Sequence, residues 1–372
     1  MAKTFNITTE ILADYFFIMD EVKCIKKNQN KLINTTMKNL KTKYMGIELD
    51  NPIIIGASNM SNDLDKLKKA EEHGAAAIIY KSLFEEQIQL ERLQLDEKLT
   101  EFNNINAEML TIHPSLKHAG PEKHLINLRN AKESLSIPVI ASLNAVNYET
   151  WIKYAKLISE TGVDGIELNF YQSPSDFSMD AKEIEDEQIR IVNAIRKDST
   201  IPISVKLSPN YSNILNFISK LDQIGADAFV LFNSFFQPDI DVANEKHIKS
   251  FNYSNEGDYK KSLRYSGLLF GNIKADVCAS HGVFTGADVI KLILSGATCV
   301  QGVSTFYKND LKHITKIKNE LLDWMEAKNY KSLDEFRGKL SKNKLNNDSL
   351  VYKRGQYIDL LMNSENIFGD TR

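Results

Sequence analysis

A short apolar run that starts at a glycine or a proline recurs along this chain and limits the folds open to it. Three runs start at proline and four at a glycine that precedes Ala or Val, and the two sets alternate: Pro52, Gly74, Pro138, Gly162, Pro202, Gly225 and Gly296. Each run is rich in Val, Ile, Leu and Ala and follows a stretch of helical periodicity, which is typical of a helix leading into a buried parallel strand. The apolar run 276–280 brings the number of such runs to eight. Eight β/α units predict an α/β fold, a closed (β/α)8 barrel of the TIM type.

We expect the barrel strands at 52–57, 75–81, 138–143, 164–169, 202–207, 226–233, 276–280 and 297–301. The barrel with its connections is expected to occupy residues 41–341, between an N-terminal extension of residues 1–40 and a C-terminal tail of residues 342–372. An amphipathic segment around residues 352–362 is expected to pack on the outside of the barrel.

Two connections are too long for simple β/α units, from residue 82 to about 120 and from 234 to about 275. In such a barrel the residues that end the strands lie at the catalytic rim, and long loops there form lids or walls of a binding site.

The composition favours small-molecule chemistry. A formal net charge of −3 provides no field to attract nucleic acid or an anionic membrane. The three cysteines, Cys24, Cys278 and Cys299, have no paired spacing, so neither a disulfide framework nor a metal site is predicted; the last two are expected to be small core residues. Because no signal peptide or membrane span is apparent, we expect a cytoplasmic protein.

Polar residues at the strand ends predict a binding site. Strand alternation directs Lys206 into the barrel, and the same parity directs Glu167 and Asn169 inward. One interpretation is a structural ion pair between Lys206 and Glu167. The other is a ligand site, because Lys81 ends a strand in a similar way and Asn144 and Asn233 extend the polar ring. Such a site suits an anionic or strongly dipolar ligand.

The last two β/α units predict a phosphate site. The segment Ser280-His-Gly-Val-Phe-Thr-Gly286 follows the seventh strand, and Gly302-Val-Ser-Thr305 follows the eighth. Backbone N–H groups of glycine-containing turns that open helices at these positions commonly bind phosphate in barrels of this type.

These residues resemble the dihydroorotate dehydrogenase family, which are FMN-containing TIM barrels. The matching segments are Asn51-Pro-Ile-Ile-Ile-Gly-Ala-Ser58, Tyr80-Lys-Ser82, Glu167-Leu-Asn169, Val205-Lys-Leu207, Asn233-Ser234, Gly282-Val-Phe-Thr-Gly286, Gly296-Ala297 and the segment Tyr330 to Lys339, which is similar to a signature of the soluble class 1 branch. The resemblance covers about residues 41–341.

The resemblance implies an oxidoreductase that acts on dihydroorotate or a related CH–CH substrate in pyrimidine (UMP) biosynthesis, with hydride transfer to flavin N5. The FMN-binding residues it implies are Ala57, Ser58, Lys81, Ser82, Asn144, Asn169, Lys206, Asn233, Gly282, Val283, Ser304 and Thr305. Asn169, Asn233 and Ser234 would bind the substrate, and Lys81, Lys206 and Ser173 would be catalytic. A homodimer without nucleic-acid or membrane partners is also expected.

Three departures from the family pattern concern the substrate pocket. One extra residue follows Asn169, so Ser173 matches the catalytic base only if the loop absorbs an insertion, and otherwise Gln172, which cannot act as a base, occupies that place. A loop that holds the orotate carboxylate is replaced by residues 110–121. His281 stands where the family usually has a glycine of the phosphate turn.

Two other functions stay open. A tRNA dihydrouridine synthase is disfavoured by the lack of a cysteine after Asn169, of a basic surface excess and of an RNA-binding domain. A non-catalytic or differently specific flavin- or phosphate-binding barrel with an altered substrate pocket is the main alternative. The electron acceptor is open among fumarate, NAD through a partner subunit, and a quinone.

Overall fold

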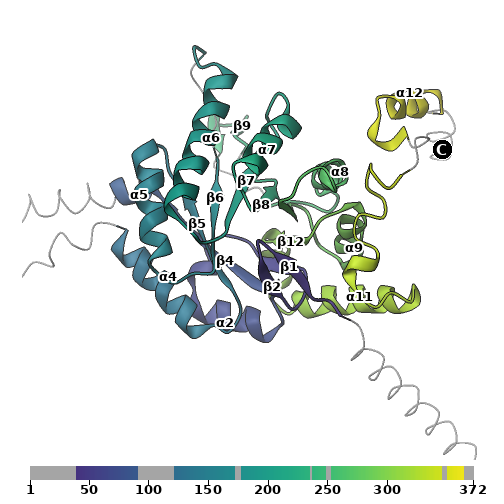
Figure 1. Ribbon diagram of the computed structural model, residues 1–372, viewed down its shortest axis with the longest axis horizontal. Helices are drawn as coiled ribbons and strands as arrows, with labels where there is room; N and C mark the ends of the chain where they lie inside the picture. The colour runs from purple at the N-terminus through teal and green to yellow at the C-terminus, as the bar shows by residue number, and fades with distance from the viewer. Residues whose placement is uncertain are drawn as a thin grey trace, which may run out of the picture.

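The computed structural model describes residues 39–90, 121–171, 177–234, 237–248, 253–345 and 350–363. Eight parallel strands close into a barrel in the order β11-β12-β3-β4-β5-β6-β7-β8, with helices around it (Figure 1). The barrel strands are β3 (Ile53–Ile55), β4 (Ala77–Phe84), β5 (Val139–Asn144), β6 (Gly165–Asn169), β7 (Ile203–Leu207), β8 (Ala228–Leu231), β11 (Asp276–Ser280) and β12 (Cys299–Gly302). Each coincides with one predicted apolar run, so the predicted (β/α)8 barrel is confirmed.

Helices follow the strands in the alternation that the repeat predicts. They are α2 (Leu64–Glu72), α4 (Glu122–Ser134), α5 (Tyr148–Ser159), α6 (Ala181–Asp198), α7 (Ile214–Gln223), α8 (Lys260–Leu269), α9 (Gly286–Ser295), α10 (Ser304–Asn309), α11 (His313–Ala327) and α12 (Gly355–Met362). Four of the recurring glycines adopt a positive φ, as in Gly296, whose N–H is bonded to the carbonyls of Leu292 and Ile293. These glycines therefore end helices and turn the chain into the next strand.

A short hairpin closes the end of the barrel where the strands begin. It consists of β1 (Thr42–Tyr44) and β2 (Ile47–Leu49), and the N–H of Met45 donates to the Asp276 carboxylate at the start of β11 (2.9 Å). Tyr44 packs with the side chains of Cys278 and Cys299, which are partners in register on β11 and β12 and fully buried. The prediction that these two cysteines are core residues is confirmed.

The two long connections both leave the carboxyl ends of strands. The first begins with helical residues 85–90, and the second contains an antiparallel hairpin of β9 (Asp239–Asp241) and β10 (Lys246–Ile248). None of the helices within the described ranges combines the length and the apolar character needed to cross a bilayer.

The prediction that the segment 352–362 packs on the barrel is wrong for helix α12. None of its residues is buried, and Tyr357, Leu360 and Met362 are at least half exposed. Figure 1 shows this helix apart from the barrel. The contact ends just before this helix, where the Tyr352 hydroxyl donates to the carbonyl of Leu340 (3.0 Å). The amphipathic pattern predicts a helix but not a surface for it to cover.

Candidate active site

A cavity of about 390 Å³ lies at the carboxyl ends of the barrel strands. Most of the residues predicted to bind cofactor or substrate line it: Ala57, Ser58, Lys81, Ser82, Asn169, Lys206, Asn233, Ser234, Gly282, Val283, Ser304 and Thr305. They come from seven different strands or the loops after them. The barrel thus brings together residues more than 240 positions apart, at the end where barrels of this type carry their active sites.

The charged centre of the cavity is Lys206 on β7. Its Nζ lies 3.3 Å from Oε1 of Glu167 and 3.2 Å from Oε1 of Gln301, and Nε2 of Gln301 donates to the other Glu167 oxygen (2.7 Å). Glu167 is fully buried, whereas the Lys206 side chain is 12% exposed to the cavity. The three residues therefore form a closed network that holds one ammonium at the floor of the cavity.

Asn169 and Asn233 form the wall beside this network. The Asn233 amide donates to Oδ1 of Asn169 (3.2 Å) and to the carbonyl of Phe170 (3.0 Å). Asn144, predicted to bind cofactor, does not line the cavity. Its amide donates to the backbone carbonyl of Asn169 (3.0 Å), so it holds Asn169 from behind.

Another part of the cavity wall is formed by the turns after β11 and β12. Gly282 has φ +69°, and a Cβ there would lie 2.7 Å from the carbonyl oxygen of Asn255. The Ser304 hydroxyl accepts from the N–H of Ser254 (3.0 Å), so a segment of the second long connection lies against the predicted phosphate turns. At position 282, only a glycine allows the carbonyl of Asn255 to approach the backbone this closely.

Three buried polar atoms of the cavity lining have no hydrogen-bond partner among the described residues: Oγ of Ser58, Oδ1 of Asn233 and Oγ1 of Thr305. A buried oxygen without a partner costs about 1–3 kcal/mol. Their clustering in one cavity indicates a polar ligand that supplies the missing donors.

Lys81 lies at the cavity within β4, beside a bulge between Tyr80 and Leu83, and the strand continues to Phe84 instead of ending at residue 81 as predicted. Ser82 and Ser142 share a hydrogen bond between their hydroxyls (2.7 Å). Burial, and then the charge of Lys81, lower the pKa of His124 on α4 to about 4, and the His124 ring packs edge-on against Tyr80 (5.4 Å between centroids). The cavity edge at Lys81 therefore has a neutral imidazole behind it.

Several lining residues were not predicted from the sequence. Gln301 could have been found, because the alternation along β12 that buries Cys299 also directs Gln301 inward. Tyr253 comes from the long connection, where no pattern predicts a direction. Ser173 and its alternative Gln172 lie outside the described residues, two and one positions beyond Tyr171, which lines the cavity.

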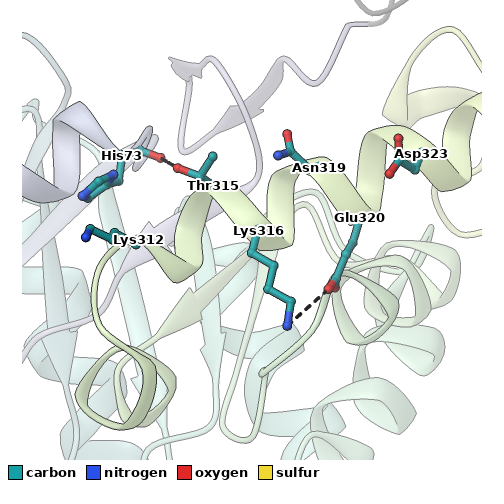
Figure 2. Close-up of a pocket in the computed structure, with 7 residues that line it drawn as sticks. All are labelled: His73, Lys312, Thr315, Lys316, Asn319, Glu320 and Asp323. Carbon is teal, nitrogen blue, oxygen red and sulfur yellow. Dashed lines mark hydrogen bonds and ion pairs between the residues drawn. The ribbon is translucent and has the colours of Figure 1, made fainter. Parts of the chain in front are cut away.

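A second, shallower hollow lies on α11 and the end of α2 (Figure 2). Its lining residues are His73, Lys312, Thr315, Lys316, Asn319, Glu320 and Asp323. Its polar groups are used structurally, since Thr315 donates to the carbonyl of His73 (3.0 Å) and Glu320 accepts from the N–H of Gly286 (2.6 Å). None of the predicted site residues lies there, so the cavity at the strand ends is the candidate active site.

Comparisons with known proteins cover most of this chain. The family model for dihydroorotate dehydrogenase matches residues 39–325. The catalytic subunit of dihydroorotate dehydrogenase B (NAD(+)) of Thermoplasma volcanium is 28% identical over 308 residues, which are 81% of this chain and 98% of that protein. The corresponding subunit of Thermoplasma acidophilum is 25% identical over 313 residues, which are 81% of this chain and 99% of that protein. Dihydroorotate dehydrogenase A (fumarate) of Lactobacillus delbrueckii subsp. bulgaricus is 25% identical over 292 residues, which are 75% of this chain and 92% of that protein.

Proposed function

This chain belongs to the dihydroorotate dehydrogenase family of oxidoreductases, and we propose that it is an FMN-dependent enzyme that oxidises dihydroorotate or a related CH–CH substrate. The observation that carries the proposal is the convergence of Lys206, the asparagine wall and the two phosphate turns on one cavity. The corresponding pathway is pyrimidine biosynthesis.

The cavity has the features that FMN requires. Its volume of about 390 Å³ lies within the range of cofactor and small-ligand sites. The turns at Gly282 and Ser304 offer backbone N–H groups to one phosphate, and Ser58, Asn233 and Thr305 offer unpaired oxygens. A bound flavin would supply a hydride acceptor, and all other roles fall to this chain's own residues.

Lys206 is proposed to stabilise the negative charge that develops on a reduced ring, because an ammonium held by Glu167 and Gln301 needs no reorganisation when that charge appears. Lys81 is proposed to lie near the ring and the substrate. Asn169, Asn233 and Ser234 are proposed to hold the substrate, and Asn144 to act through its bond to Asn169. Ser173 is proposed as the base that removes the substrate proton.

A second candidate is a flavin- or phosphate-binding barrel that is non-catalytic or has another substrate. The extra residue between Asn169 and Pro174 favours it, because Gln172 then competes with Ser173 for the position of the base. We also propose a cytoplasmic location and a homodimer; light scattering on the purified protein tests the homodimer.

The test of the main proposal is the absorbance spectrum of the purified protein. We expect a yellow protein that releases FMN rather than FAD on denaturation and whose flavin band bleaches on anaerobic addition of dihydroorotate. Because relatives are named for NAD(+) and for fumarate, both are offered as acceptors for reoxidation. A protein that stays colourless after incubation with FMN contradicts the main proposal. Bound FMN that dihydroorotate does not bleach favours the second candidate.

A further inference from the structure

His281 adopts a backbone conformation that suits glycine. Its φ is +78°, and the next residue, Gly282, has φ +69°. A side chain in this left-handed region costs on the order of 1 kcal/mol relative to glycine. Because the His281 side chain lines the active-site cavity, the strained conformation presents an imidazole where a glycine would present nothing.

The carboxylate of Asp258 lies near the His281 imidazole. Its Nε2 lies 3.8 Å from Oδ2 of Asp258, and the same oxygen accepts from the N–H of Asn255 (2.7 Å). The segment 253–258 that carries Asp258 is itself tied down, since Lys308 donates to the carbonyl of Ser254 (2.9 Å). The ring therefore has a carboxylate 3.8 Å away, and the His281 side chain is 29% exposed.

The charge environment favours a neutral ring. Burial lowers the pKa of His281; Asp258 opposes this effect, while Lys261 and Lys206 add to it. A neutral imidazole has one donor and one acceptor nitrogen, so it pairs well with hydroxyl groups. A phosphate would be better served by cations or by the backbone N–H groups of the adjacent turn.

His281 lies beside the predicted phosphate turn. It directly precedes Gly282, and both residues line the same cavity as Lys206. In FMN the group that joins ring and phosphate is a chain of hydroxyl-bearing carbons.

We propose that the His281 imidazole hydrogen-bonds the hydroxyls of that linking chain and makes the site selective for flavins that carry it. This inference rests on the proposed FMN site.

The test replaces the imidazole with the residue that the backbone prefers. Apoprotein of the wild type and of His281→Gly is titrated with FMN, with riboflavin, which lacks the phosphate, and with lumiflavin, which lacks the hydroxyl-bearing chain. Quenching of flavin fluorescence reports Kd. We expect His281→Gly to raise the Kd of FMN and of riboflavin about tenfold and to leave the Kd of lumiflavin almost unchanged. Its thermal unfolding should not occur at lower temperature, because the glycine removes strain.

Glu245→Gly is the matched control. Glu245 also has a positive φ (+50°), but it lies exposed in the hairpin connection and outside the cavity, so all three affinities should be unchanged. Equal FMN affinity in the wild type and His281→Gly overturns this inference alone, since His281 is then a turn residue. A loss confined to FMN overturns it in favour of phosphate binding, and an equal loss for all three flavins in favour of a structural role. A wild type that binds no flavin overturns the proposed function as well.

Discussion

Nζ of Lys206 lies 3.3 Å from Oε1 of Glu167, and the carboxylate is fully buried while the ammonium reaches the cavity. The two interpretations that the sequence leaves open, an ion pair and a ligand site, are therefore not exclusive. Glu167 and Gln301 hold the cation on one side, and its exposed side faces the space where the ring of a flavin is proposed to bind.

The two roles can be separated by stability and kinetics. Lys206→Met leaves the buried Glu167 charge without its cation, and breaking a buried pair in this way costs about 3–5 kcal/mol of the free energy of unfolding. Adding Glu167→Gln removes that charge and should restore most of the loss. Urea unfolding of the wild type, the single variant and the double variant measures this recovery.

Flavin reduction by the substrate should not recover in the double variant. Loss of one electrostatic group of this kind slows a reaction by about 100-fold or more, and stopped-flow bleaching of the flavin band measures the rate. A double variant with both stability and rate near those of the wild type would mean that Lys206 is only structural.

The fold was predictable because the signal repeats. Each barrel strand is buried on both faces, so it reads as an apolar run, and each starts after a proline or after a glycine or other turn that ends a helix. Eight repetitions leave few alternatives. Lys81, Asn169 and Lys206 were predictable for the same reason, because strand alternation and the barrel's closure determine where they point.

Residues that depend on long connections could not be predicted in this way. Tyr253 lies at the cavity because one loop folds back onto the turns after β11 and β12. The contacts of this loop with Gly282 and Ser304 involve single atoms without periodicity. The prediction that helix α12 packs on the barrel is wrong for a related reason. The apolar residues of this helix predict a helical face but carry no information on what that face contacts.

Removing an unpaired hydroxyl of the cavity should affect the protein differently with and without FMN. Ser58→Ala eliminates an oxygen that is buried without a partner, so the apoprotein should be equally or more stable. The FMN complex should be weaker by about 1 kcal/mol if the ligand donates to that oxygen. Thermal unfolding of both forms measures the difference.

Ser341→Ala is the control for this experiment, since the Ser341 hydroxyl is also buried and unpaired but lies outside the cavity. Its effect should be the same with and without FMN. A stabilisation by FMN that is equal in wild type and Ser58→Ala would remove Ser58 from the proposed cofactor site.

Stability should fall with acid because of His124. Its pKa of about 4 in the folded protein lies below the ordinary 6.5, so the unfolded chain takes up a proton first as the pH falls. The contribution of the neutral His124 ring to the free energy of unfolding is complete above pH 6.5. It is lost between pH 6.5 and about 4, and the loss is at most about 3 kcal/mol. His124→Phe keeps an aromatic contact with Tyr80 and should flatten this dependence in urea titrations.

The same replacement at the exposed His247 is the control and should leave the slope as in the wild type. If His124→Phe loses stability with acid as steeply as the wild type over this range, another group is responsible.

The catalytic base is the assignment that decides the substrate. Ser173 lies outside the described residues, but it follows Tyr171 of the cavity wall by two positions. If the loop absorbs the extra residue, Ser173→Ala should abolish reduction of the flavin by dihydroorotate while FMN content and reduction by dithionite stay normal. Gln172→Ala should have a mild effect. Because the sequence neighbours of Ser173, Gln172 and Pro174, cannot take its proton, the rate should rise with pH in the wild type. Anaerobic stopped-flow measurements across pH give all of these values. An active Ser173→Ala variant would mean that this base is absent, and the chain would then be a flavoprotein of the family acting on a substrate other than dihydroorotate.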